Sequence, residues 1–415
     1  MRVAVCRRSS ARDSLRDADL PLQNFVNKSV AVAGDSRPPG FYARLRRSKG
    51  SSEVSTFRPG AFQSLCLIEI WATRQNGNSG YTLTVLKAIG GNNMALDHYV
   101  SQVHLRNFYS PMLVQHMYAM RKSDLQSFPC NSRSVCRIEE GSTNAYLIND
   151  RSIEAFLLDV EPRYNSAVTN LRDNKIDREC IHAIAGFAAY VSCCAPAAMR
   201  IHTEPLKSLL ESEAAILDKQ DLVPNAPPSL GSKTLTELLA DKEVTFSVDP
   251  KFPQALGINT IIERVSILGN SKWEILLNGV PECPFFTSDF PVAIESTDYR
   301  TMNWIVPLTP ALAIRIIPDM RLSGTAPDLS FTKFTSQQRK LRRSEIVKIN
   351  RLVVQCAEDL VFYRDDHEWI GNFVARNRYY RIEMVTDRIP YGTGFMNIST
   401  QRIVKHQGGC PRFRI

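Results

Sequence analysis

The sequence predicts an α+β protein, in which a helical middle packs on a small mixed or antiparallel sheet after a disordered N-terminal extension. Three observations lead to this prediction. Residues 149–270 carry apolar side chains at helical spacing, the chain after Lys272 turns to short β-rich runs, and residues 1–93 have little pattern of either kind. With 415 residues, the chain is longer than one hydrophobic core usually supports.

Residues 1–93 carry most of the net charge. They hold 14 Lys and Arg against 6 Asp and Glu, or +8, which leaves 37 against 36, or +1, for residues 94–415. A basic arm for nucleic acid or lipid would need interleaved aromatic residues, and a transit peptide would lack the early acids. We favour translation from Met94, followed by one domain over 94–390 and a tail over 391–415.

Residues 149–270 are predicted to be mainly helical. An apolar stripe runs from Asp150 to Leu171, and Pro162 should kink that helix. The next segment is apolar nearly all round, which is typical of a buried helix that Pro196 should end. The four helices expected after the first cover Cys180 to Cys194, Leu206 to Lys219, Thr234 to Asp241 (with a Thr234–Glu237 capping box) and Asn259 to Leu268.

Residues 271–390 are predicted to form strands and one long helix. Short β-rich runs between turn residues indicate strands, and an apolar stripe indicates the helix Ser336 to Leu360. The chain beyond Pro390 shows no periodicity. The expected strands are Trp273 to Leu277, Pro284 to Thr287, Asn303 to Val306, Ala311 to Ile317 and Arg378 to Arg388.

Composition excludes several classes of protein. No stretch reaches the roughly 18 uninterrupted apolar residues of a membrane span, so we expect no membrane partner. Ten irregularly spaced Cys are typical of reduced thiols, which indicates a cytoplasmic protein. The motifs of zinc fingers, P-loop NTPases, dinucleotide-binding folds and serine hydrolases are absent, so the sequence identifies no cofactor.

The segment from Asp97 to Phe108 groups polar side chains that carry chemistry. His98, Gln102 and Arg106 are four residues apart, so a helix beginning near Ser101 would project them from one side. His98 would act as a general base, Gln102 would orient water or substrate, and Arg106 would bind a carboxylate or phosphate. Spacing alone favours the alternative, in which His98 and Arg106 tie this segment to the core.

A second group of residues, Phe285 to Val292, contains Thr287-Ser288-Asp289-Phe290-Pro291 at the end of a predicted strand. A carboxylate in that position is well placed for catalysis or for binding a metal ion. Asp289 is equally well placed to hold a turn, because Asp accepts hydrogen bonds from main-chain N–H groups nearby, and on local grounds the turn is the better explanation.

The segment from His98 to Phe108 resembles the opening of a family of uncharacterised bacterial proteins known as domain of unknown function 4238, whose motif is His-Tyr-Val-Pro, then Gln, then Leu-Arg-x-Phe. Ser101 replaces the motif's Pro, which is tolerable because Ser caps helices. The family opens close to its start Met, which supports Met94. Further matching features follow in order: Glu161, Phe187 to Arg200, Thr287 to Pro291, Pro307 to Pro310, Asn350, and Ala357 to Phe362.

The resemblance implies no reaction, but it implies one shared site of His98, Gln102, Arg106, Glu161 and Asp289. Our first hypothesis is a hydrolase of phosphodiester or nucleotide substrates, with His98 as base, Arg106 on phosphate, and Asp289 and Glu161 as ligands of a divalent metal. The alternative is a non-enzymatic binding or regulatory module whose motifs are structural. Either would suit a toxin-like or phage-defence setting, with nucleic acid or a nucleotide as partner.

Overall fold

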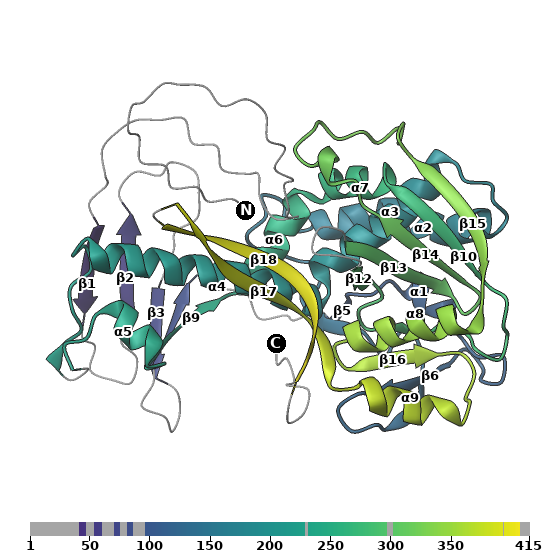
Figure 1. The fold of residues 1–415 in the computed structure, drawn as a ribbon, viewed down its shortest axis with the longest axis horizontal. Helices are drawn as coiled ribbons and strands as arrows, with labels where there is room; N and C mark the ends of the chain where they lie inside the picture. Colours follow the sequence, from purple (N-terminus) through teal and green to yellow (C-terminus); the bar gives the residue numbers. More distant parts are fainter. Residues whose placement is uncertain are drawn as a thin grey trace.

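The computed structural model describes residues 41–46, 54–59, 70–74, 81–85, 96–228, 231–296, 302–392 and 394–406. Its architecture is α+β: helices of the middle segment pack against small sheets built mainly from the second half of the chain (Figure 1). The described helices are α1 (Gln102–Arg106), α2 (Ser152–Arg172), α3 (Arg178–Cys194), α4 (Pro196–Lys219), α5 (Leu235–Ala240), α6 (Lys251–Asn259), α7 (Ile261–Gly269), α8 (Arg343–Cys356) and α9 (Trp369–Asn377).

Two sheets adjoin the second signature segment, Phe285 to Val292, whereas the first signature segment, Asp97 to Phe108, lies outside both. The first sheet has the strand order β12-β13-β14-β10-β15, and the second sheet has the order β11-β16-β6-β7. In the first sheet β15 pairs in parallel with β10, whereas the other pairings are antiparallel. Their strands are β12 (Ala293–Ser296), β13 (Met302–Thr309), β14 (Leu312–Ile317), β10 (Lys272–Asn278), β15 (Thr335–Leu341), β11 (Thr287–Ser288), β16 (Leu360–Tyr363), β6 (Met117–Arg121) and β7 (Ser127–Cys130).

The remaining strands lie around this body. β5 pairs with β8, and β17 pairs with β18 in a long hairpin that extends beside α4 (Figure 1). Four N-terminal strands form a sheet with β9, the last of them in parallel. The bounds are β5 (Leu96–His98), β8 (Arg137–Glu139), β17 (Tyr380–Tyr391), β18 (Gly394–Lys405), β9 (Val244–Val248), β1 (Phe41–Arg46), β2 (Val54–Pro59), β3 (Ile70–Arg74) and β4 (Tyr81–Val85).

The centre of the core is α3, as its apolar composition predicts. The side chains from Cys180 to Cys194 are buried apart from His182, and the helix packs between α2 and α7. Asp177 caps the helix, because its carboxylate accepts a hydrogen bond from the N–H of Cys180 at 2.7 Å. The described cysteines are free and buried.

Several predicted elements are confirmed. α2 covers the predicted helix from Asp150 to Leu171 to within two residues, and α5 begins with the predicted capping box of Thr234 and Glu237. The predicted helix over 259–268 corresponds to α7, although the separate helix α6 that precedes it was not expected. Four of the five predicted strands match β10, β13, β14 and β17 to within a few residues, whereas the expected strand Pro284 to Thr287 overlaps β11 only at Thr287.

One helix start and one long helix were predicted wrongly. α3 ends at Cys194, just before Pro196, as expected, but the next helix begins at Pro196 and not at Leu206, because proline fits the first turn of a helix, where no intrahelical N–H donor is needed. The predicted long helix Ser336 to Leu360 is instead strand β15 followed by the shorter α8, because β15 pairs with β10 along its length. The sequence also offered no sign of β18 in the predicted tail.

The predictions of disorder over residues 1–93 and of a start at Met94 concern residues that are mostly not described. Before residue 96, the structure describes only β1 to β4. In the part of the chain that is described, no single helix has the length and apolarity to cross a membrane. Among the described helices, only α3 and α4 taken together are long and apolar enough, and the two are bent by 59° relative to each other.

Candidate functional site

The first signature segment is held by its main chain. β5 ends at His98, the N–H of Tyr99 donates to the carbonyl of Cys136 at 2.9 Å, and the hydroxyl of Tyr190 donates to the carbonyl of His98 at 2.8 Å. α1 starts immediately afterwards. Its direction is therefore set by contacts with β8 and α3, and the side chains of α1 have fixed positions relative to both.

The outer face of α1 presents Gln102 and Arg106. The Arg106 guanidinium donates to the side-chain oxygen of Gln102 at 3.3 Å, and the hydroxyl of Ser132 donates to the same oxygen at 3.3 Å. Gln102 is half-buried, whereas Arg106 is exposed. This hydrogen-bonded chain holds a cation at the surface in a defined orientation, as the four-residue spacing predicted.

His98 lies next to this face with one unpartnered atom. Its Nε2 is buried and has no hydrogen-bond partner among the described residues. Burial and the Arg137 guanidinium lower the pKa of His98, while Glu161 and the main chain at Ser132 and Arg133 act in the opposite direction. The imidazole is therefore neutral near pH 7, and Glu161 of α2 lies close enough to affect it.

His104, in the same segment, points the other way into the core. It is fully buried, with Nδ1 2.7 Å from the hydroxyl of Tyr164 and Nε2 2.8 Å from the hydroxyl of Thr287. The ring also stacks on Phe187, with centroids 4.7 Å apart. Burial lowers the pKa of His104 to about 3, so a neutral imidazole joins α1, α2 and the second signature segment.

Asp289 is buried and its carboxylate is occupied by main-chain donors. Oδ1 accepts from the N–H of Glu358, and Oδ2 accepts from the N–H groups of Asp359 and Leu360, each at 2.8 Å. The N–H of Asp289 in turn donates to the carbonyl of Leu360 at 3.0 Å. Burial raises the pKa of Asp289 to about 6, although the three donors act to lower it. The carboxylate fastens β11 to the start of β16.

The predicted site is thus divided. Gln102 and Arg106 are joined by a hydrogen bond, and Glu161 lies near His98, whereas both oxygens of Asp289 face the main chain before β16. Among the described residues, no three His, Cys, Asp or Glu side chains gather in a way that could hold a metal ion. A shared catalytic site and a metal bound by Asp289 and Glu161 remain predictions.

Sequence reasoning missed His104, Tyr164 and Thr287, which link the two signature segments directly. A signal was present, because His104 and Leu105 of α1 and Phe108 in the turn after it are spaced at i, i+1 and i+4 and are all buried. The expected cap at Ser101 was wrong. The Ser101 side chain makes no cap hydrogen bond, its buried hydroxyl has no partner, and its φ of −55° is close to the value that proline imposes.

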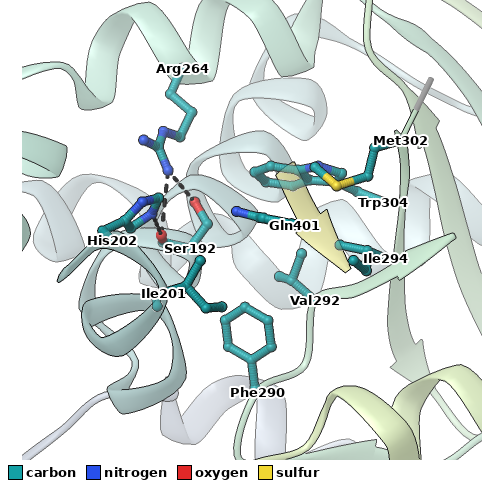
Figure 2. A pocket seen from close by; sticks show the side chains of 11 residues that line it. Ser192, Ile201, His202, Arg264, Phe290, Val292, Ile294, Met302, Trp304 and Gln401 are labelled. Atoms are coloured by element: carbon teal, nitrogen blue, oxygen red, sulfur yellow. Dashed lines mark hydrogen bonds between the residues drawn. The ribbon is translucent and has the colours of Figure 1, made fainter. Parts of the chain in front are cut away.

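A small cavity lies beside the second signature segment, and none of the predicted site residues lines it (Figure 2). Phe290 and Val292 form part of its apolar wall. On its polar side, the Nε2 of His202 lies 3.0 Å from the carbonyl of Ser192, and Arg264 donates to the Ser192 hydroxyl at 2.9 Å. The volume of about 20 Å³ has room for about one water molecule. It is too small for a nucleotide.

Comparison with known proteins identifies one family. The model for the proteins of unknown function called DUF4238 matches residues 97–367, which is more than half of the chain and includes both signature segments. No curated protein and no solved structure matches the chain.

Proposed function

We propose that this chain, which belongs to the DUF4238 family of proteins of unknown function, is a binding module that recognises a phosphate group, as in a nucleotide. The observation that carries the proposal is the exposed Arg106 guanidinium, oriented by Gln102, which Ser132 holds in turn. A fixed guanidinium at the surface suits a phosphate, because its planar donors can pair with two phosphate oxygens at once.

The buried signature residues support a binding module more than an enzyme. Both carboxylate oxygens of Asp289 accept hydrogen bonds from main-chain N–H groups, and His104 is enclosed between Tyr164 and Thr287. Neither side chain presents an atom to a ligand at the surface of α1. Their chemistry is that of buried polar groups that are satisfied internally and hold segments together.

A phosphodiester hydrolase is the second candidate, and one observation favours it. The Nε2 of His98 lacks a partner, and the lowered pKa of His98 keeps the ring able to accept a proton near neutral pH. In that role His98 would take a proton from water while Arg106 binds the phosphate, with Glu161 near the imidazole.

Isothermal titration of the full chain with ADP tests the binding proposal. We expect Arg106→Gln to weaken binding about tenfold or more, because it removes a charged donor pair. Arg151→Gln is the matched control, since Arg151, just before α2, is likewise an exposed arginine with one side-chain partner, Glu154. Equal affinity of the two variants, or no binding by the wild type, would overturn the proposal.

The same samples separate binding from hydrolysis. Release of inorganic phosphate from ADP, or of p-nitrophenol from bis-p-nitrophenyl phosphate, would be followed in the wild type and in His98→Gln. Turnover that disappears in His98→Gln while ADP binding persists would establish the hydrolase. If the wild type binds ADP but hydrolyses neither compound, the result supports the binding module and not the hydrolase.

A further inference from the structure

The first sheet has two unlike edges. At one edge, β12 is covered, because α8 and β18 pack against it. At the other edge, β15 pairs only with β10 among the described strands, and Figure 1 shows it along the outer border of the molecule. Half of the main-chain N–H and C=O groups of a strand point to each side, so one row of β15 faces away from β10.

The side chains of β15 leave this edge accessible. Thr335, Ser336, Gln337 and Lys340 are exposed, and only Leu341 is buried. Gln338 is directed inward, where its amide donates to the carbonyl of Arg172 at the end of α2 at 3.0 Å. The strand is therefore anchored on one face by α2, while its outer edge offers polar main-chain groups without bulky apolar cover.

Positive charge predominates beside this edge. Lys340, Arg342 and Arg343 follow one another at the end of β15 and the start of α8, all exposed, and none forms an ion pair with a described residue. Arg339 differs, because Glu345 lies 2.5 Å from its guanidinium and balances its charge. Arg342 lies beside the same Glu345 carboxylate, which accepts from its N–H at 2.9 Å, so four cations share one nearby acid. A row of main-chain donors and acceptors next to this excess of positive charge is complementary to an extended acidic strand.

We propose that the outer edge of β15 binds an extended acidic segment of a partner protein by strand addition. Main-chain hydrogen bonds to β15 supply the pairing, and Lys340, Arg342 and Arg343 select carboxylate side chains at one end. This surface lies on a different sheet edge from the α1 face and does not depend on the phosphate-binding proposal.

Fluorescence anisotropy of the full chain with a labelled heptapeptide of alternating glutamate and valine tests this edge. A second peptide of the same sequence carries N-methyl groups on alternate residues, which keeps its charge but removes strand donors. We expect the dissociation constant to rise about tenfold or more for the N-methylated peptide, and likewise for the variant Lys340→Glu, Arg342→Glu, Arg343→Glu.

The matched control is Lys219→Glu, Lys242→Glu, Lys405→Glu, which reverses three exposed cations elsewhere and should leave binding unchanged. Circular dichroism confirms that each variant is folded. Equal binding of the two peptides would show attraction by charge alone and would overturn strand addition. The absence of binding would also overturn it. So would a dimer of the wild type in sedimentation velocity, if the dimer is lost in the triple β15-end variant but persists when the peptide is added.

Discussion

Ser101 is a signature position that is explained by its main chain. Its hydroxyl is buried without a partner, and its φ of −55° lies within the range that proline fixes. The motif that this segment resembles has Pro at this position. The residue therefore serves to hold the entry into α1, and a side chain that fixes φ does this better than a hydroxyl that caps nothing.

Ser101→Pro should stabilise the chain by about 0.4 to 1 kcal/mol, because it restricts the unfolded chain and removes an unpartnered buried hydroxyl. Urea denaturation followed by circular dichroism measures the change. Ser101→Ala removes only the hydroxyl, so the difference between the two variants isolates the effect of the ring. A proline variant less stable than the wild type would show that the Ser101 N–H is needed.

His104 makes stability depend on pH. Its folded pKa of about 3 lies below the ordinary value of 6.5, so its contribution is fully present above pH 6.5 and is lost as pH falls toward 3. At pH 5 we expect a loss of about 2 kcal/mol from this residue. His104→Phe should reduce the slope of unfolding free energy against pH by about 1.4 kcal/mol per pH unit between pH 4 and 6.

Tyr164→Phe provides the control, because it removes one hydrogen bond of His104 but leaves the imidazole. It should lower stability while keeping the slope. An unchanged slope in His104→Phe would mean that His104 does not titrate between the folded and unfolded states as its burial requires.

At the scale of elements, α2 and α3 approach each other at Gly186. A β-carbon added there would lie 2.7 Å from the Cγ2 of Val160, which is closer than packed atoms tolerate. Glycine is therefore needed for packing, although it weakens the helix by about 1 kcal/mol relative to alanine. This crossing positions Tyr164 for its contact with His104.

Gly186→Ala should destabilise the chain by about 1 to 3 kcal/mol, because the helices must separate to admit the methyl group. Gly371→Ala is the matched control in α9, where the nearest atom to an added β-carbon is Met120 Cε at 4.0 Å. That variant should be neutral or more stable by up to about 1 kcal/mol. Thermal unfolding of both tests the packing, and equal midpoints would contradict it.

Apolar periodicity predicted the elements that bury one face well. It failed for segments whose secondary structure depends on pairing with residues far away in the sequence. α2 and α3 were predicted well, since their apolar positions match a helix. Residues 335–340 are polar and exposed or half-buried, and they become a strand only through pairing with β10. β18 likewise depends on twelve paired residues of β17 and has no strong alternation of its own.

For the whole molecule, the sequence located both signature segments but not their partners. The three N–H groups that hold Asp289 come from main chain about seventy residues later, and no side-chain pattern marks them. The role of His104 depends on burial by α2 and α3, which spacing in one short helix does not reveal. The predicted surface pair of Gln102 and Arg106 needed only helical geometry, which is why it was found.

The central claim is that one signature residue holds the fold while another faces a ligand. Urea unfolding of Asp289→Ala and Arg106→Gln tests it, with the exposed Asp366→Ala as control for the loss of an acid. We expect Asp289→Ala to lose about 1 to 3 kcal/mol, because three buried N–H donors lose their acceptor, and the other two to stay within about 0.5 kcal/mol of wild type. Wild-type stability in Asp289→Ala, or a comparable loss in Arg106→Gln, would contradict this division of roles.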